Sequence, residues 1–512
     1  MSQAVRSRLG FRRLLSPRAS GLLGLLGALG LTACGHSTAV SPEVGVEVPE
    51  RWTAEAAISE AAPGDLSLPA LAASDLPEVG FDLGEPALAA VIEEALEGNR
   101  DLAAAAARLD QAAARARIAG ADLWPQASAG FDANRSKRNF IGFPIPGSGG
   151  DEVLSSTSTT FGVALNVSWE PDLWGRVRAG RDAANADLAA AQADFVGARR
   201  SLAAQTAKAW LAAVEAAQQR SLAQVTLENR EDSTAKVRRR YEAGLRSPLD
   251  LRLAQASDEG ARASLAARRA QLDAALRQLE VLLGRYPAAR LELAGELPRA
   301  AAVPAGLPSE LVTRRPDVQA AERRLVAAGA RVAEARASLY PRITLTGSTG
   351  TSSEQLENLL DGDFSVWSLA GSILQPLFQG GRLRAGVDLA RATEAEGVAA
   401  YAGTVLRAFA EVETNLAATE LLRLQEEALE GAVEQAVAAE RLAQERYGSG
   451  LADYLTVLES QRQALDSQSQ LLSVRRQRLA AQIDLYLALG GDLEPSLEPE
   501  QVPSDPLEAA AR

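Results

Sequence analysis

The chain has one cysteine, one histidine and one methionine, and aromatic residues make up only 4% of its 512 residues. A single cysteine can form neither an intrachain disulfide nor a site with several thiolate ligands. The single histidine, His36, leaves almost no scope for general-base, triad or zinc chemistry that depends on histidine. Carboxylates are plentiful, but no glycine-rich phosphate motif accompanies them, so we expect no catalytic residues, no metal site and no enzyme.

Positive charge is also scarce, with 53 lysines and arginines against 66 aspartates and glutamates, for a net charge of −13. Nucleic-acid binding requires a basic face, so we expect no nucleic-acid partner. Alanine, by contrast, is very frequent, and it is the strongest helix former. The composition therefore favours a mainly helical protein that is not an enzyme.

The N-terminal residues follow the order of a secretory signal peptide, in which arginines precede the apolar run from Gly21 to Leu31. A transmembrane helix needs about 20 apolar residues, so this run is too short to span a membrane. Leu31-Thr32-Ala33-Cys34 resembles the bacterial lipobox. We therefore expect residues 1–33 to be removed and Cys34 to carry a covalent lipid, the only attached group; a cysteine buried for packing is the alternative. By resemblance to lipoprotein sorting, Gly35 lacks the aspartate that retains lipoproteins on the inner membrane, which favours the outer membrane.

Several landmarks occur twice in the same order, which indicates an internal duplication. The paired segments are Asn99–Leu102 with Arg315–Val318, Leu123–Pro125 with Leu339–Pro341, Trp174–Gly180 with Gly380–Gly386, and Arg240–Leu245 with Arg446–Leu451. The duplication predicts a lipid-anchored segment at 34–82, a first repeat at 83–298, a second repeat at 299–491 and an acidic, proline-bearing tail at 492–512.

Each repeat is expected to contain a very long helix, because Gly175 to Tyr241 and Gly381 to Tyr447 contain no proline and are rich in helix formers. At 1.5 Å per residue such a helix is roughly 100 Å long, and it needs partner helices along its length. After the second long helix, apolar residues recur at every seventh position, which predicts a coiled-coil seam. They are Leu451, Leu458, Leu465, Leu472, Leu479 and Tyr486.

Two windows between the helices, 124–174 and 340–378, hold about half of the aromatic residues. In the first, Phe161, Val163, Leu165, Val167 and Trp169 alternate with small or polar residues, as in a transmembrane β-strand with one apolar face. A soluble hairpin would also alternate. We expect strands at about 126–140, 157–170, 342–350 and 364–378.

Four strands cannot close a barrel, and an open edge in lipid leaves backbone groups without hydrogen bonds at several kcal/mol each. If these strands enter the membrane, the chain must therefore form oligomers. Two copies provide about eight strands, whose interior would be filled with side chains, whereas three copies provide about twelve strands and leave room for a lumen.

The sequence resembles the TolC-like outer-membrane factors, in particular the lipoprotein branch that serves resistance-nodulation-division efflux pumps. The resemblance extends from about Leu83 to Leu489 and rests on Trp169–Arg176, Arg315-Pro316-Asp317, Gln375–Phe378 and the two Tyr-x-x-Gly turns. It implies a mainly helical TolC-like fold with a β-barrel portion. Such a protein is a homotrimer whose twelve-stranded transmembrane barrel, with four strands per chain, continues into a long α-helical coiled-coil barrel in the periplasm.

The resemblance also implies a function and partners. The chain would be the passive exit duct of a tripartite pump, carrying small molecules such as drugs or other toxic compounds from the periplasm to the outside. Its partners would be a periplasmic adaptor protein, an inner-membrane pump and the lipid of the outer membrane.

By the same resemblance, the duct is closed by a gate at its periplasmic helix tips. Tyr447 would donate its hydroxyl to Asp250, a charge-assisted bond of roughly 1.5 to 3 kcal/mol, and Glu459 would join an acidic ring across the pore. A Tyr447→Phe change should then raise the channel's conductance. Ala452 and Thr456 depart from the family pattern, which has an arginine and an acid at these places, so we expect either a weaker lock or one made by other residues, such as Asp453 or Arg246.

The remaining tip residues, Tyr241, Gly244 and Gly450, are expected to shape the turns, with glycine forming a left-handed cap. The alternative for the gate residues is that they are ordinary solvated residues at a helix turn.

Two other functions stay open at this point. An exit duct for secreted proteins would have the same architecture, but members of the family in that role commonly lack a lipobox. A lipid-anchored coiled-coil scaffold would keep the heptads, but it has no use for paired strand windows.

Overall fold

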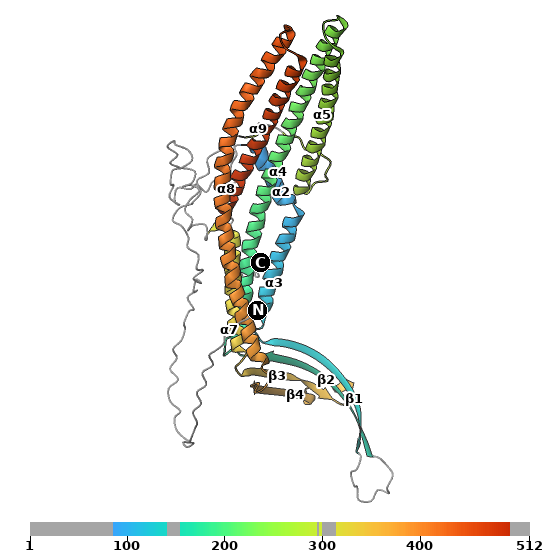
Figure 1. Ribbon diagram of the computed structural model, residues 1–512. Coiled ribbons are helices and arrows are strands. Elements are labelled where there is room, and N and C mark those ends of the chain that lie inside the picture. Colours follow the sequence, from blue (N-terminus) through green and yellow to red (C-terminus); the bar gives the residue numbers. More distant parts are fainter. Residues whose placement is uncertain (1–84, 141–153, 294–295, 299–313, 492–512) are drawn as a thin grey trace, which may run out of the picture. The chain divides into compact units, whose positions relative to one another are not determined.

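The computed structural model describes residues 85–140, 154–293, 296–298 and 314–491, and both repeats have the same order of elements (Figure 1). The first repeat contains α2 (Pro86–Gly98), α3 (Arg100–Ala121), β1 (Gln126–Phe140), β2 (Leu154–Trp169), α4 (Arg176–Glu242) and α5 (Pro248–Leu282). The second contains α7 (Pro316–Ala337), β3 (Arg342–Ser353), the short 3-10 turns η3 (Leu356–Asn358) and η4 (Gly362–Phe364), β4 (Ser365–Leu374), α8 (Arg382–Gly448) and α9 (Tyr454–Ala488). Corresponding helices have equal lengths of 22, 67 and 35 residues, as two related repeats would have.

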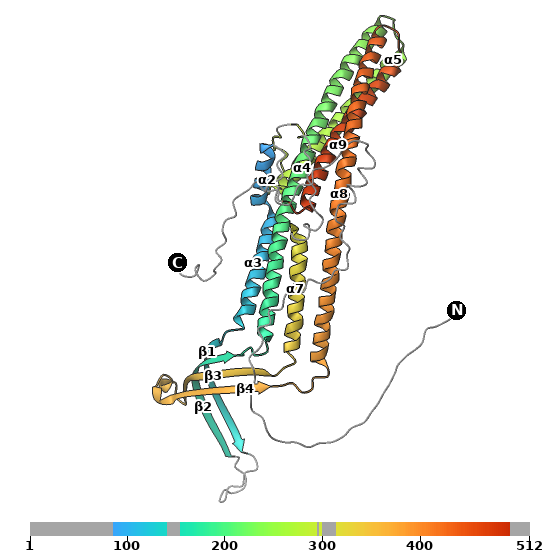
Figure 2. The ribbon, with the colours of Figure 1, turned by 90° about the vertical axis from the view of Figure 1, so that its left-hand side faces the viewer.

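The two 67-residue helices, α4 and α8, each pack against the shorter helices of their own repeat (Figure 2). Helix α4 packs against α3 and α5 and also against α7 and α9 of the second repeat, and α8 packs against α7 and α9. The junction between the shorter partners is tight, since a Cβ on Gly98 would lie 2.4 Å from the carbonyl oxygen of Leu283. The short helices therefore follow one another along each long helix and give it the partner surface that its length requires.

The hydrophobic core lies between helices of both repeats. Its largest member, Trp210 on α4, is 1% exposed and packs with Leu279 of α5 and Leu479 and Ile483 of α9. The same cluster also contains small residues, such as Ala203, at which helices can approach closely. Within the described residues, no helix combines the length and the apolar composition that a membrane crossing requires.

The expected leucine seam on α9 is only partly buried in this chain. Leu479 is buried, but Leu458, Leu465 and Leu472 are half-buried and Leu451 is 72% exposed. The buried stripe instead includes the residues one position earlier, Val457, Ala464 and Leu471. The heptad period was predicted correctly, but the helix is rotated so that smaller residues also face its neighbours.

The four strands form one antiparallel sheet in the order β1-β2-β3-β4. Strand β1 has the expected bounds, while β2 and β3 differ from expectation by up to three residues. The prediction for the fourth strand was wrong at its end, because β4 stops at Leu374 rather than at 378. Pro376 has no N–H to donate to a ladder, and the Gln375 side chain donates to the Leu339 carbonyl (3.2 Å).

Candidate functional site

The tips of the two repeats, where each long helix turns into a 35-residue helix, end in the same type of cap. Gly244 and Gly450 have φ of 72° and 78°, a left-handed conformation that glycine adopts without strain. The Leu245 N–H donates to the Arg240 carbonyl (2.8 Å), and the Leu451 N–H donates to the Arg446 carbonyl (2.9 Å). These are Schellman caps, as the glycines predicted. Tyr241 takes part through its backbone, since its carbonyl accepts from Gly244 (2.9 Å).

The helices that leave the tips begin with matching N-caps. Ser247 Oγ accepts from the backbone N–H of Asp250 (3.3 Å), and Asp453 Oδ1 accepts from the backbone N–H of Thr456 (3.0 Å) and from its hydroxyl (2.6 Å). The bonds from Thr456 hold the pKa of Asp453 below its usual value. Asp453 is therefore a helix cap, and a gating role for it remains only a prediction.

Tyr447 lies in the core of the tip and is 7% exposed. Its ring lies near two guanidinium groups of the other repeat, with Cζ of Arg246 at 4.4 Å and Cζ of Arg240 at 5.5 Å from the ring centroid. The Tyr454 ring packs at 5.3 Å and is tilted by 55°. Burial is the main cause of the raised pKa of both phenols, and it raises that of Tyr454 to about 12.

The same two arginines bind the C-terminal end of α8. Arg240 Nη1 donates to the Tyr447 carbonyl (3.0 Å) and Nη2 to the Gly448 carbonyl (2.8 Å), while Arg246 Nη2 donates to the Tyr447 carbonyl (3.2 Å). Carbonyls at a helix C-terminus lack intrahelical partners and carry the negative end of the helix dipole, so they favour cations. We name Arg240, Arg246, Tyr447 and Gly448 the tip latch. It joins the two repeats of one chain.

The expected bond between Tyr447 and Asp250 is absent from this structure. The buried Tyr447 hydroxyl has no hydrogen-bond partner among the described residues, and Asp250 contacts the Ser247 hydroxyl on its own helix (3.4 Å). The prediction was therefore wrong for this conformation, because a carboxylate in the first turn of α5 is favoured by that helix's N-terminus. Arg240 was missed as a functional residue, although it opens the repeated Arg-Tyr-x-x-Gly landmark.

Glu459, the expected member of an acidic ring, is 63% exposed and pairs with Arg462 on the same helix (2.6 Å). Such an exposed pair contributes at most about 1 kcal/mol. Its position at a pore axis therefore stays a prediction.

The sheet has one apolar face and one polar face. Residues paired across an antiparallel ladder share a face, and the pairs Phe131 with Val163 and Ile343 with Ile373 lie on the apolar face. Trp367 and Leu369, on the same face, are each 79% exposed. The opposite face is rich in hydroxyls and includes the side-chain contacts Ser136 with Ser158 (3.3 Å) and Ser348 with Ser368 (2.8 Å). Among the described strands, β1 and β4 each pair along one edge only.

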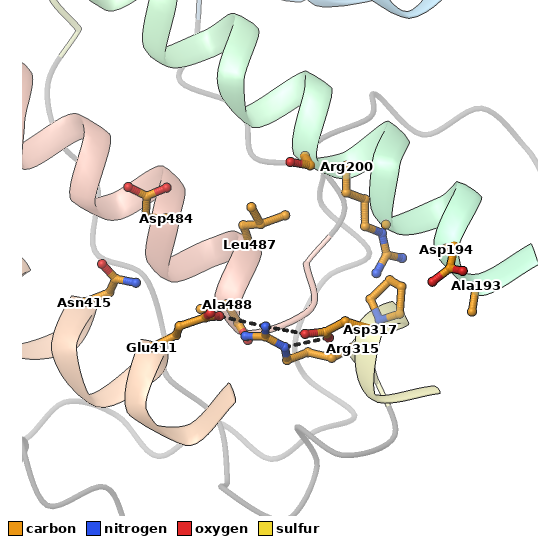
Figure 3. Close-up of a pocket in the computed structure, with 13 residues that line it drawn as sticks. Ala193, Asp194, Arg200, Arg315, Asp317, Glu411, Asn415, Asp484, Leu487 and Ala488 are labelled. Carbon is orange, nitrogen blue, oxygen red and sulfur yellow. Dashed lines mark hydrogen bonds and ion pairs between the residues drawn. The ribbon is translucent and has the colours of Figure 1, made fainter. Parts of the chain in front are cut away.

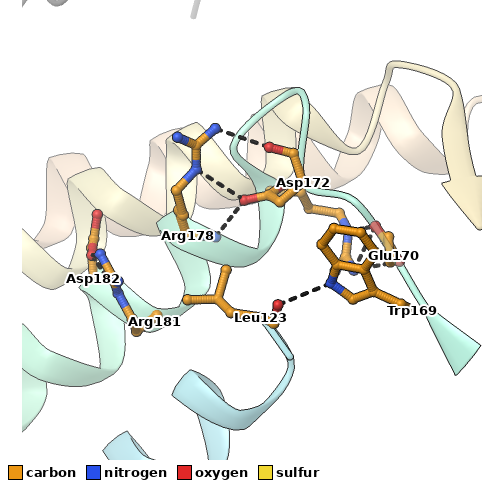
Figure 4. A network of polar contacts seen from close by, with 8 residues as sticks. Leu123, Trp169, Glu170, Asp172, Arg178, Arg181 and Asp182 are labelled. Atoms are coloured by element: carbon orange, nitrogen blue, oxygen red, sulfur yellow. Dashed lines mark hydrogen bonds and ion pairs between the residues drawn. The ribbon is translucent and has the colours of Figure 1, made fainter. Parts of the chain in front are cut away.

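Polar contacts fasten the sheet to the helices, as Figure 4 shows. The Trp169 indole N–H donates to the Leu123 carbonyl (3.0 Å), and Asp172 accepts from the backbone N–H (2.8 Å) and the Nε (3.3 Å) of Arg178. Burial opposes these bonds, but they outweigh it and lower the pKa of Asp172. The Trp174 indole N–H donates to the Pro341 carbonyl (2.7 Å). These contacts join the end of β2 and the segment that follows it to the turns before β1 and β3 and to the start of α4.

A second cluster lies beside a cavity of about 590 Å³ between α4, α7, α8 and α9 (Figure 3). Arg315, which is 8% exposed, donates to Asp317 (2.8 Å) and to the Ala488 carbonyl (3.1 Å) and pairs with Glu411 (2.7 Å). In the first repeat Asn99 makes the corresponding connection, because its amide donates to the Leu282 carbonyl (2.9 Å). Each repeat therefore joins the start of its 22-residue helix to the end of its 35-residue helix.

Comparison with known proteins assigns this architecture to a family. The family model described as outer membrane efflux protein matches residues 91–285 and 307–491, one segment in each repeat. The chain belongs to the outer membrane efflux protein family. The two matched segments lie within the two expected repeats.

Several relatives of this efflux protein cover most of its length. It is similar to the pyoverdine export outer membrane protein OpmQ of Pseudomonas putida, with 36% identity across 91% of this chain and 96% of OpmQ. It is 37% identical to the outer membrane protein OprJ of Pseudomonas aeruginosa, across 78% of this chain and 83% of OprJ. The open state of the MtrE outer membrane channel of Neisseria gonorrhoeae has a TM-score of 0.72 and 32% identity, and the match covers 80% of this chain and 90% of MtrE.

These findings confirm the TolC-like fold class, the outer-membrane location and the role as an outer-membrane channel of an efflux pump. The lipid attachment at Cys34 and the segments 1–33, 34–82 and 492–512 lie outside the described residues, so those expectations stay predictions.

Proposed function

We propose that three copies of this efflux protein close one twelve-stranded barrel, in which β4 of each copy pairs with β1 of the next. The observation that supports this is the single four-stranded sheet with one exposed apolar face and two open edges. In lipid, an open edge costs several kcal/mol for each unpaired backbone group, and closure removes that cost. The apolar face then contacts lipid, and the hydroxyl-rich face lines the lumen.

The helical part continues the barrel into the periplasm as a passive duct with its gate at the tips. The tip latch supports this, because it connects the first repeat to the end of α8 through three hydrogen bonds. Opening moves the two tips apart and breaks the latch. Glu459 and Asp250 lie close to the tips in sequence and contribute charge to the constriction.

A periplasmic adaptor protein docks on the tips and connects the duct to an inner-membrane pump. Four leucines support this proposal, because they are more than half exposed and occupy equivalent places in the two tip turns. They are Leu245, Leu249, Leu451 and Leu455. Exposed leucines grouped at one end of a protein are typical of an interaction surface.

The cargo is a class of small molecules, and a covalent lipid on Cys34 adds an anchor in the outer membrane. OpmQ is named for pyoverdine export, which supports a small molecule as cargo. Mass spectrometry of the purified protein tests the anchor: a mature chain that starts at Cys34 and carries acyl chains supports it, and an unmodified Cys34 contradicts it.

The oligomeric mass tests the proposed barrel. The full-length protein, extracted from membranes in detergent, is measured by light scattering with correction for the bound detergent. A trimer is the expected result. A monomer that is stable without detergent would contradict the barrel and favour the lipid-anchored coiled-coil scaffold. A trimer that restores secretion of a protein substrate, but not efflux of small molecules, would favour the protein-secretion duct.

A further inference from the structure

A cavity of about 360 Å³ lies where β2, β3 and β4 meet the starts of α4 and α8. We name it the junction pocket. Arg176, Arg342 and Arg382 line it, together with the aromatic pair Trp174 and Tyr340, whose rings stack at 5.2 Å with an interplanar angle of 22°. In a chain with a net charge of −13, three arginines around one cavity indicate a local preference for anions.

The carboxylates that line the junction pocket are already occupied. Glu170 accepts three hydrogen bonds from Arg176 (3.0 to 3.1 Å), and Asp172 accepts from Arg178. Arg342 has only a 3.5 Å contact with Glu170 in the described part of the chain. The guanidinium group of Arg382, in the same part, donates only to the side chain of Gln379 (2.7 Å). Two guanidinium groups therefore face the pocket with most of their donors available.

The starts of α4 and α8 add a second, independent argument. A helix N-terminus favours acidic residues and disfavours basic ones. Both long helices nevertheless begin Arg-x-Arg, at Arg176 and Arg382, and neither has an acidic residue in its first turn. Neither glycine N-cap provides a side-chain bond to the free N–H groups. At α4 the backbone N–H of Arg178 already donates to Asp172 (2.8 Å), so it is the start of α8 that brings positive charge to the pocket from the backbone as well as from the Arg382 side chain, which favours a bound anion.

The register of the sheet places Arg342 on the side of the lumen. Arg342 pairs with Leu374, and the next pair on that face is Thr344 with Ser372, on the hydroxyl-rich face. The apolar face, with Ile343 and Ile373, is on the other side. If the barrel closes as proposed, a ligand of Arg342 comes from the duct and not from the lipid.

We propose that the junction pocket is an anion-binding site in the wall of the duct, which takes the carboxylate or phosphate group of solutes as they pass from the helical tunnel into the barrel. Arg342 and Arg382 bind the anion through charge-assisted hydrogen bonds. Trp174 and Tyr340 provide an aromatic surface beside it for the apolar part of the solute. This inference depends on the proposed barrel, because the barrel decides which face is inside.

Calorimetric titration of the detergent-solubilised full-length protein with inorganic phosphate tests the site. We expect binding to the wild type, weakened at least about tenfold by the double change Arg342→Gln and Arg382→Gln, since each removes charge-assisted bonds. Arg342→Lys keeps the charge and should bind within a few-fold of the wild type. Arg391→Gln, on the exposed side of α8 outside the pocket, is the matched control and should bind like the wild type.

Absence of phosphate binding to a trimeric wild type would overturn this inference and leave the proposed function intact, whereas a monomeric wild type would overturn the proposed function itself. Equal binding by the double variant would also overturn the inference. The lipid is excluded by repeating the titration in nanodiscs of phosphatidylcholine with or without phosphatidylglycerol. Competition by phosphatidylglycerol would mean that the pocket holds a lipid headgroup, and it would contradict the assignment to solutes.

Discussion

Replacing Arg246 with alanine should weaken the tip latch and open the channel. The change removes the hydrogen bond to the Tyr447 carbonyl (3.2 Å) and the cation over the Tyr447 ring (4.4 Å). A hydrogen bond from a charged group contributes about 1.5 to 3 kcal/mol and a partly exposed cation–π contact about 0.5 to 1 kcal/mol. Because Arg246 is only half-buried, we take the lower end, about 2 kcal/mol for each chain. That corresponds to about a 30-fold shift towards the open state for each latch.

Single-channel recording in planar bilayers measures this shift as the open probability of the purified trimer. Arg239→Ala is the matched control, because Arg239 lies next to the tip in the last turn of α4 but outside the latch, and the change should leave the open probability unchanged. Tyr447→Phe provides a sharper comparison. The sequence alone predicted that losing this hydroxyl would raise the conductance, but the hydroxyl has no partner among the described residues, so the structure predicts no increase. Tyr447→Ala, which removes the ring, should open the channel.

The opposite pattern would refute this reasoning. If Arg246→Ala conducts like the wild type while Tyr447→Phe raises the conductance, then the closed trimer is held by a phenol to carboxylate bond that forms only on assembly. The latch described here would then be an incidental contact.

Three further predictions concern stability and assembly. Replacing the buried Arg315 with alanine removes its hydrogen bond to the buried Ala488 carbonyl and its pairs with the half-exposed Asp317 and Glu411, and it should cost about 2 kcal/mol, measured as a fall in Tm. Arg324→Ala, which breaks an exposed pair on the same helix, should cost less than about 1 kcal/mol. Burial raises the pKa of Asp317, but the bonds from Arg315 outweigh burial and hold this pKa below its usual value. The pair of Arg315 with Asp317 should therefore stabilise the protein above about pH 4, the unfolded-state value, and this contribution should be lost as the pH falls through the lowered pKa. Asp317→Asn should remove this dependence from the profile of Tm against pH. Leu369→Arg, on the apolar face, should cost about 2 to 4 kcal/mol and reduce the yield of trimer in the outer membrane, while Ser368→Arg, one residue away on the hydroxyl-rich face, should be tolerated.

The repeats, the long helices and the first three strands could be predicted because their signals are local. Absence of proline, glycine at the turns and alternation along a strand each act within a few residues of the chain. Thus β1 has the expected bounds, and both long helices end next to the glycines that predicted their caps.

The contacts of the gate could not be predicted because they are not local. Arg240 and Tyr447 are 207 positions apart, and whether Tyr447 meets a carboxylate or two guanidinium groups depends on how the two tips pack. The buried face of α9 could not be predicted for the same reason. The seven-residue period is a property of one helix, but the face that becomes buried is set by the neighbouring helices, which approach closely at small residues such as Ala464.

The tip latch exists because the two repeats differ at a few positions. Tyr241 is the equivalent of Tyr447, yet it is 39% exposed, whereas Tyr447 is 7% exposed. The difference follows from their partners, since the position equivalent to Arg246 is Ala452, which cannot bind a carbonyl or cover a ring. If the two tips were identical, each would offer the same arginines and the same helix end to the other, and the contact would have no preferred direction. Duplication thus provided two equal helical hairpins, and differences such as that between Arg246 and Ala452 let the connection run in one direction, from the first repeat to the end of α8.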